Sequence, residues 1–477
     1  MPFLSYRHAA QLRQELKDTR ATVVTPEKED FPELIRRWSD TCEKEAGAVV
    51  MVTSSHEVAL VVAFANRHYI PIAVQGGGYS TSGASSTHGG IVINLSAMHN
   101  VLVDPASATI AVQGGATWGE VDQAAEREGL AVVGCTTSAA GVGGTTLSGG
   151  FGWLTGRHGL VIDNLVSVKM VLADGRVVTA SEAEHPDLFW AVRGAGQSFG
   201  VATEFVLLAH RQRSPIFGGL LYFPADRLAA VIEFANQFDE RATGDEGLFF
   251  GFTTRPPDLL STVIVALLFY NGPRVAAEAF FAPLLALGPI QNETCEMPYP
   301  RMNTILGPLA ASGARKRLSG TTVRLPLDPQ IVHEVYEDFD RIMRSYPRVE
   351  GSVVVFELLP YARVSQVPLD ATACANRGPY HNVATILRWH DPELDAKMAN
   401  LERALLRKIR ERGGVASIAG HGVGIYANYA GHEANAQELF GDNLPRLQKL
   451  KKQYDPKNMF RKWHNLLTHS HEPTVIC

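Results

Sequence analysis

The sequence predicts an α+β fold made of two parts with different patterns. Residues 46–212 alternate short apolar runs with glycine-rich turns and contain two stretches of helical periodicity. Residues 213–425 alternate long amphipathic helices with apolar strands. Tight turns between the strands of the first part argue against a strict βαβ series there. The second pattern is typical of an antiparallel sheet that carries its helices on one face.

The elements of the first part follow from its apolar runs. We expect strands at residues 48–54, 70–75, 90–95 and 108–115. We expect helices at residues 54–69 and 117–129, because each opens with Ser or Thr at an N-cap position followed by Glu. Residues 1–45 precede them as a charged lead-in, and the amphipathic pattern of residues 26–45 predicts a helix.

The second part combines helices and strands in similar number. Helices are expected at residues 223–238, 271–287, 328–345 and 391–411. Strands are expected at residues 247–255, 260–270, 351–361 and 381–389. The end of the chain opens with a basic amphipathic helix that stops at an Asp-Pro-Lys-Asn turn, residues 455–458. We therefore divide the chain into residues 1–45, 46–212, 213–440 and 441–477.

Composition excludes several classes of protein. Charged residues make up 19% of the 477 residues and the net charge is −5, so no basic surface for nucleic acid is expected. The five cysteines are odd in number and scattered, which predicts neither a disulfide framework nor a metal site. No run of about 20 apolar residues is present, so no membrane span is expected. We expect a soluble, cytoplasmic protein.

Three glycine-rich stretches are the most informative feature of the chain. They read QGGGYSTSG at residues 75–83, GVGGTTLSGGFGW at residues 141–153 and RGAGQSFGVAT at residues 193–203. Glycine has no Cβ, so such loops let backbone N–H groups approach a phosphate or a flat ring closely. Each stretch alone is better explained as a tight turn in a β-rich fold. Together they predict one long cofactor in a groove.

The three stretches and the C-terminal tail resemble the FAD-linked oxidases of the vanillyl-alcohol oxidase superfamily, in its berberine-bridge-enzyme-like branch. The resemblance covers nearly the whole chain. It implies a two-part FAD-binding module of the PCMH type at residues 46–212, with residues 1–45 as part of that module. It also implies a substrate-binding domain of antiparallel sheet and helices at residues 213–440, and a segment at residues 441–477 that returns to the FAD module.

The resemblance also implies which residues bind FAD. In the first loop they are Gln75, Gly76, Gly77, Gly78, Tyr79 and Ser80. The second loop and its approach contribute Thr137, Gly141, Gly143, Gly144, Gly149 and Gly150. The third loop and the C-terminal part contribute Gly196, Gly200, Val201, Asn428 and Asn465.

Two departures from the family pattern bear on how FAD is held. Tyr79 stands where the family usually places a histidine joined covalently to the flavin, and Thr137 stands where doubly linked relatives have a cysteine. Neither residue can form the family's bond, so the departures imply noncovalent FAD. Cys135 lies two residues before Thr137, and a shift in register that brings it to the flavin is the alternative.

The candidate catalytic residues lie outside the glycine loops. Residues 426–429, Tyr-Ala-Asn-Tyr, resemble a family motif in which the second tyrosine, here Tyr429, serves as a base. Glu357 and Tyr361 fall on one face of the expected strand 351–361 and are further candidates. The alternative is that residues 426–429 form an ordinary strand and that these side chains are structural. His421 and His432 flank the motif as weaker candidates.

The resemblance implies an FAD-dependent oxidase that removes hydride from a hydrophobic small molecule, such as a secondary metabolite, with O2 reoxidising the flavin. An alternative is a non-redox cyclase or isomerase that retains FAD for the shape or electrostatics of its pocket. A third is a flavoprotein without turnover. The sequence offers no strand–GxGxxG–helix unit, which disfavours a nicotinamide-dependent dehydrogenase.

Overall fold

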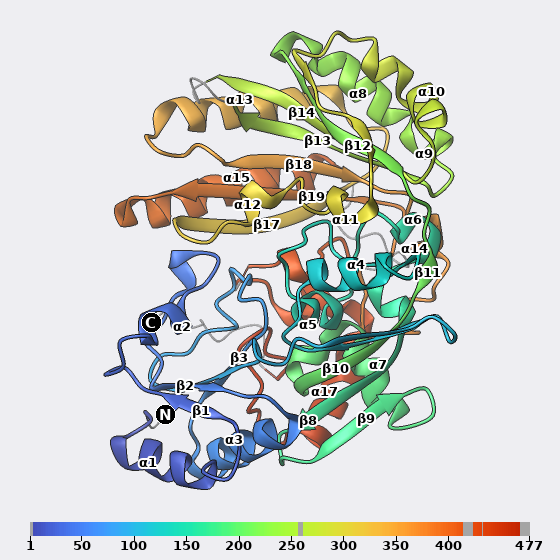
Figure 1. Cartoon of the computed structure of the whole chain (residues 1–477). Helices are drawn as coiled ribbons and strands as arrows, with labels where there is room; N and C mark the ends of the chain where they lie inside the picture. The colour runs from blue at the N-terminus through green and yellow to red at the C-terminus, as the bar shows by residue number, and fades with distance from the viewer. Residues whose placement is uncertain (1–2, 256–260, 414–422, 432, 468–477) are drawn as a thin grey trace.

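Two sheet-containing parts lie one above the other in a computed structural model of the chain, which describes residues 3–255, 261–413, 423–431 and 433–467. In Figure 1 the blue and teal segments of the first half of the sequence form the lower part. The yellow-green, yellow and orange segments form most of the upper part, which is built on one large sheet. The mixed helix and strand content confirms the α+β prediction.

The first sheet of the lower part is mixed and its strand order is β1-β2-β4-β3. Strands β2 and β3 are parallel to β4, whereas β1 is antiparallel to β2. The bounds are Thr22–Val24 for β1, Ala48–Met51 for β2, Ile72–Gln75 for β3 and Ile91–Asn94 for β4. Helix α3 (Ser55–His68) begins after Ser54, whose hydroxyl accepts a hydrogen bond from the Glu57 N–H, as the sequence predicted.

The prediction of a helix over residues 26–45 is wrong. This segment contains only α2 (Phe31–Ile35) and the short 3₁₀ helix η1 (Asp40–Cys42). Between them the chain turns under the first glycine loop, where the buried Arg37 donates from Nε and Nη2 to the Ser85 carbonyl at 3.2 and 2.7 Å. Tertiary hydrogen bonds of this kind override the amphipathic pattern.

The second sheet of the lower part is antiparallel, in the order β5-β6-β10-β8-β9. Its bounds are Val101–Asp104 (β5), Thr109–Gln113 (β6), Leu165–Leu172 (β8), Val177–Ser181 (β9) and Gly200–Leu208 (β10). Helix α4 (Trp118–Glu126) opens with the predicted N-cap, because the side chains of Thr117 and Glu120 bond reciprocally to each other's backbone N–H. Of the five strands, sequence patterns identified only β6.

The upper part is an antiparallel sheet in the order β15-β12-β14-β13-β18-β19-β17, with β16 also paired to β12. The predicted strands are β13 (Glu246–Thr254), β14 (Thr262–Tyr270), β18 (Val353–Leu358) and β19 (His381–Trp389). The others are β12 (Ile216–Phe223), β15 (Gln291–Asn292), β16 (Cys295–Met297) and β17 (Arg315–Val323). The predicted helices are α8 (Leu228–Asn236), α10 (Arg274–Leu285), α13 (Pro329–Ser345) and α15 (Asp395–Arg412).

The large sheet has two faces with different partners. Val354, Phe356 and Leu358 of β18 lie in one hydrophobic cluster with residues of α8, α13 and α15. Side chains alternate along a strand, so Val355 and Glu357 lie on the opposite face, which lines a cavity. The prediction of helices on one face is thus confirmed, and the other face is free to form a site.

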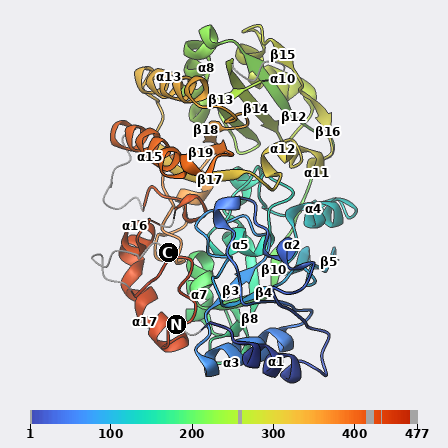
Figure 2. The ribbon, with the colours of Figure 1, turned by 90° about the vertical axis from the view of Figure 1, so that its left-hand side faces the viewer.

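The C-terminal helices return to the lower part of the molecule. Figure 2 shows α16 (Ala436–Phe440) and α17 (Leu444–Tyr454) along one side of it, next to α7 (Pro186–Ala195). Lys451 of α17 is fully buried, and its Nζ donates to the carbonyls of Ser198 and Phe460 and to the Asp455 carboxylate, at 2.6–2.8 Å. This lysine therefore ties the tail to the third glycine stretch.

Among the residues that the structure describes, no helix is both long and apolar enough to span a bilayer. No group of three or more His, Cys, Asp and Glu side chains in the same ranges is placed to hold a metal ion.

Replacing Lys451 with methionine is expected to lower the free energy of unfolding by about 3–5 kcal/mol, because it leaves Asp455 buried without its cationic partner. Urea denaturation measures the change. The control is Lys452→Met on the exposed side of the same helix, which we expect to change stability by less than about 0.5 kcal/mol. Equal effects of the two substitutions would contradict the anchoring role of Lys451.

Candidate active site

A cavity of about 710 Å³ separates the glycine loops from the free face of the large sheet. Its floor is formed by the first and second glycine stretches and by strand β3, and its roof by β12, β14, β13, β18 and β19. Residues 426–430 and 460–463 close one side. The volume lies within the range of about 300–1,000 Å³ that is usual for sites that bind small molecules and cofactors.

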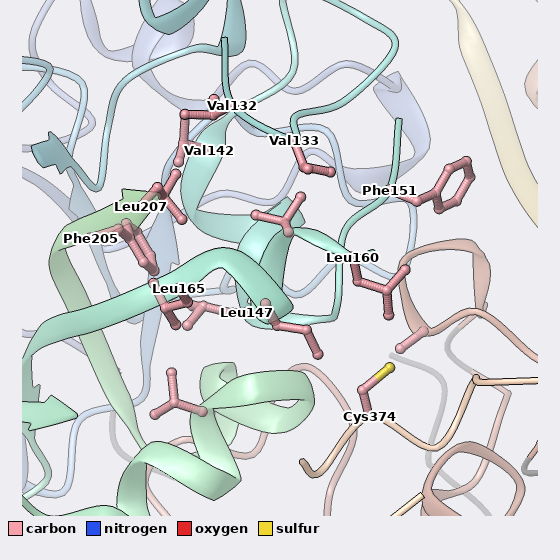
Figure 3. Close-up of a cluster of buried hydrophobic side chains, with 14 of the residues drawn as sticks. Val132, Val133, Val142, Leu147, Phe151, Leu160, Leu165, Phe205, Leu207 and Cys374 are labelled. Atoms are coloured by element: carbon pink, nitrogen blue, oxygen red, sulfur yellow. The ribbon is translucent and has the colours of Figure 1, made fainter. Parts of the chain in front are cut away.

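The first two glycine loops touch each other at Gly77 and Gly141. A Cβ on Gly77 would lie 2.7 Å from the Gly141 nitrogen, and a Cβ on Gly141 would lie 2.6 Å from the Gly77 nitrogen. Behind this contact, Val142 and Leu147 of helix α5 (Val142–Leu147) pack in the core with Phe205 of β10, as Figure 3 shows. Only glycine permits this approach, so the backbones form a smooth floor.

The donors on the floor fit a dinucleotide such as FAD. The hydroxyl of Ser85 is buried and has no hydrogen-bond partner among the described residues, although Ser85 lines the cavity. A Cβ on Gly144 would meet no atom within 4 Å, which leaves space above the second loop. Unpaired hydroxyls and exposed backbone N–H groups suit a diphosphate.

Lysine 462 adds a positive charge to the cavity wall that sequence patterns did not single out. Burial lowers the pKa of its ammonium to about 8, and the neighbouring cations Lys44 and Arg461 add to the shift. A bound anion would reverse this effect, because it favours the charged form of the lysine.

Most residues that the sequence assigned to FAD line this cavity. They are Gly76, Gly77, Gly78, Tyr79, Ser80, Thr137, Gly141, Gly143, Gly144, Gly200, Val201 and Asn428. The three glycine stretches, which are far apart in the sequence, therefore line the same cavity.

The other five residues that the sequence assigned to FAD do not line the cavity. The Gln75 side-chain oxygen accepts a hydrogen bond from Asn94, and the Asn465 oxygen accepts one from Asn458. The three glycines, Gly149, Gly150 and Gly196, pack against other side chains: a Cβ there would meet Cys374, Val161 and Leu147 respectively. These contacts explain why glycine is required at the three positions. The three glycines support the walls of the cavity without lining it.

Tyr79 and Cys135 occupy the positions that matter for covalent attachment. The Tyr79 ring stacks on Trp38 with 6.0 Å between centroids, and its hydroxyl donates to the Ala310 carbonyl at 3.0 Å. Cys135 and Thr137 both line the cavity. Burial raises the pKa of the Cys135 thiol to about 11, so it is protonated and a weak nucleophile near neutral pH.

Glu357 and Tyr429 form a buried polar pair in the cavity. The Tyr429 hydroxyl donates to Glu357 Oε1 at 2.9 Å, and Oε2 of the same carboxyl has no partner among the described residues. Burial raises the pKa of Glu357 to about 8, while the hydrogen bond from Tyr429 opposes that shift. Burial, followed by the Glu357 charge, raises the pKa of Tyr429 well above 10.

The segment that carries Tyr429 is a 3₁₀ helix, η6 (Ala427–Tyr429), and so the alternative of a strand is wrong. A Cβ on Gly320 of β17 would lie 2.8 Å from the Tyr429 ring, so this glycine admits the tyrosine to the sheet face. Asn428 Nδ2 donates to the Tyr426 hydroxyl at 2.7 Å. The Phe151 ring lies 5.0 Å from that of Tyr426.

Tyr361 does not share the strand face of Glu357. Strand β18 ends at Leu358, and Tyr361 is the N-cap residue of α14 (Ala362–Ser365). Its buried hydroxyl accepts a hydrogen bond from Asn382 Nδ2 at 3.0 Å, and Tyr361 is absent from the cavity lining. The period-2 argument failed because the strand stops three residues earlier. His421 and His432 lie outside the described residues.

Sequence reasoning missed several side chains of the wall, among them Trp38, Ser85, Arg255, Phe460 and Lys462. They come from separate strands and loops and form no local motif. A period-2 pattern on β19 could have placed Arg388 on the same face as Ala384, but it does not tell which face borders a site.

Comparison with known proteins agrees with this geometry. Residues 46–181 match the family described as FAD binding domain, and residues 425–466 match the one described as Berberine and berberine like. The FAD-linked oxidoreductase pgmH of Aspergillus terreus is 37% identical, over 95% of this chain and 94% of that protein.

Solved structures share the fold. BBE-like 1 of Physcomitrella patens has a TM-score of 0.83 at 20% identity and covers 96% of this chain and 99% of that one. The 6-hydroxy-D-nicotine oxidase of Arthrobacter nicotinovorans has a TM-score of 0.81 at 22% identity, with 94% and 98% covered. The fold is therefore that of the PCMH-type FAD enzymes.

The chain belongs to the berberine-bridge-enzyme-like family of FAD-linked oxidoreductases. The family resemblance drawn from the glycine stretches and the tail is confirmed. The match to the FAD binding domain supports FAD as the cofactor of this protein.

Replacing Gly77 with valine is expected to give a folded protein that purifies without flavin, because the side chain separates the two loops at their contact. Absorbance in the flavin region and titration with FAD measure the loss. Gly307→Ala is the control, since its Cβ meets no protein atom within 4 Å and Gly307 does not line the cavity. A Gly77→Val protein with a full complement of FAD would show that the contact is not needed for binding.

Proposed function

We propose that the protein is an oxidase that removes hydride from a hydrophobic small molecule while Glu357 takes up a proton. The observation that carries the proposal is the buried Glu357 carboxyl in the cavity, held by Tyr429 through one oxygen and free at the other. When bound, FAD supplies the two-electron acceptor for the reaction and, we propose, passes the electrons to O2.

The relative pKa values favour Glu357 over Tyr429 as the group that accepts the proton. A general base works best when its pKa lies near the operating pH. Glu357 fulfils this condition with a pKa of about 8, whereas the pKa of Tyr429 is well above 10. Tyr429 then acts by orienting the carboxyl and by stabilising its ionised form.

The walls between the polar groups support a hydrophobic substrate. The sheet face presents apolar side chains to the cavity, among them Leu220, Val265, Leu267, Val353, Val355 and Ile386. A neighbour of the same fold is named as an oxidase of 6-hydroxy-D-nicotine, which supports a small-molecule substrate here.

We also propose that FAD is held without a covalent bond. Tyr79 is engaged with Trp38 and Ala310, and Thr137 has no thiol. Cys135 reaches the cavity, but its protonated thiol is a weak nucleophile.

Replacing Glu357 with glutamine is expected to slow substrate-dependent bleaching of the flavin by about 10²–10⁴-fold, the usual contribution of a general base. The measurement is anaerobic stopped-flow absorbance, with a substrate found by screening hydrophobic alcohols, amines and phenols. In the unaltered protein the rate should rise with pH and level off above about pH 8, because the ionised carboxylate is the active form.

Tyr429→Phe should shift the pH profile of the bleaching rate to higher pH, because it removes the hydrogen bond that lowers the pKa of Glu357. Tyr380→Phe is the matched control, because Tyr380 donates to the Val423 carbonyl and does not line the cavity. A Glu357→Gln enzyme with unaltered rates would remove Glu357 from the base role. Product formed without any bleaching would favour the non-redox cyclase or isomerase.

Acid precipitation is expected to release all flavin into the supernatant, as noncovalent binding requires. The absorption spectra of pellet and supernatant measure the partition. Yellow colour that stays in the pellet, and that Cys135→Ser abolishes, would instead establish a covalent link through Cys135.

A further inference from the structure

Two arginines stand at the end of the cavity farthest along the sheet from Glu357. Arg255 follows strand β13, and Arg388 lies on β19; both are half-buried and line the cavity. Neither forms an ion pair with any described residue. The Arg388 Nε is buried and has no hydrogen-bond partner in the same ranges. A buried guanidinium without an acceptor is costly, so this end of the cavity suits an anionic group.

A glycine before β18, the strand between β13 and β19, makes room for the Arg388 guanidinium. Gly351 lies two residues before β18 and has φ of +82°, which disfavours any side chain there. A Cβ at Gly351 would lie 3.2 Å from Arg388 Nη1, so the arginine leans over this position. The last paired residues of β13 and β18 are Thr253 and Val353, and Arg255 stands two residues farther along its strand.

The other charged side chains at this end of the cavity, Lys316 and Glu350, do not pair with the two arginines. The Arg255 guanidinium lies 5.1 Å from the centre of the Tyr222 ring, which supports it without neutralising it. Lys316, opposite Arg388 on β17, donates its ammonium hydrogens to the carbonyls of Trp38 and Ala311. Glu350 also lines the cavity but forms no ion pair with either arginine.

The wall between the arginines and the base is apolar. From Glu357 to Val353, the first residue of β18, the strand advances four residues, which corresponds to about 13 Å. Val353 and Val355 face the cavity along this path, with Ile386 on the neighbouring strand. The cavity therefore offers a proton acceptor at one end, a hydrophobic wall, and at the other end two guanidinium groups that form no ion pair with the residues that the structure describes.

We propose that Arg255 and Arg388 bind a carboxylate at one end of an elongated hydrophobic substrate. The planar guanidinium matches the two oxygens of a carboxylate and can hold them through paired hydrogen bonds. The proposal rests on the proposed function, because it concerns the same substrate cavity. Its test measures binding alone, so a failure of Glu357 as the base leaves the result readable.

Isothermal titration calorimetry of the FAD-loaded protein with 8-phenyloctanoate and with 8-phenyloctanamide tests the proposal. The two probes share the apolar body and differ in the charged end. Near neutral pH the unaltered protein should bind the carboxylate about tenfold or more tightly than the amide, as expected for a charge-assisted hydrogen bond. The double variant Arg255→Gln/Arg388→Gln should bind both probes equally, with the amide affinity unchanged.

Two control variants distinguish direct contact between the arginines and the carboxylate from the long-range effect of nearby charges. Arg348→Gln removes an exposed arginine near the site that does not line the cavity, and it should leave the preference for the carboxylate intact. Glu350→Gln should maintain or strengthen the preference, because it removes a negative charge.

Several results would overturn the proposal. They are equal affinities in the unaltered protein, binding of neither probe at millimolar concentration, a preference that survives in the double variant, and an equal loss in Arg348→Gln. Loss of FAD from the double variant would assign the arginines to the cofactor instead.

Discussion

The contact between Gly77 and Gly141 is the constraint on which the rest of the site depends. Two loops more than sixty residues apart meet with their backbones closer than any side chain would allow. Neither loop fills the space above the contact, so the face of the large sheet lies over them with a gap between. The sheet touches the first loop at β17, where the Thr81 hydroxyl donates to the Leu318 carbonyl at 3.0 Å. The cavity is the space that this arrangement leaves, and its floor consists of backbone donors.

Burial of Glu357 shows how the fold favours reactivity over stability at one position. Its pKa rises from 4.5 to about 8 because the carboxyl is removed from water. A group whose pKa is raised by folding contributes its full stabilisation below pH 4.5 and loses it as the pH rises through about 8. The shift corresponds to at most about 5 kcal/mol. The hydrogen bond from Tyr429 limits this loss and keeps the carboxyl in place.

The first glycine loop departs from the family pattern at Tyr79. This residue stands where the pattern has a histidine, and its ring stacks on Trp38 in the wall of the cavity. Under the noncovalent binding that we propose, affinity for FAD would depend on contacts from the loops, from Ser85 and from Lys462, together with the tail that Lys451 anchors. These contacts come from four separate regions of the sequence.

The sequence by itself determined the α+β class, most helices of the upper part and the family, because glycine loops, caps and amphipathic periods are local patterns. It did not reveal strands such as β17, whose residues alternate between ion pairs and the cavity edge, nor the irregular path of residues 26–45. The tertiary structure alone decided that Glu357 meets Tyr429, that Tyr361 lies off the strand face, and that Arg255 and Arg388 share one end of the cavity. Such choices depend on strand ends and on pairings between distant segments, which no local pattern encodes.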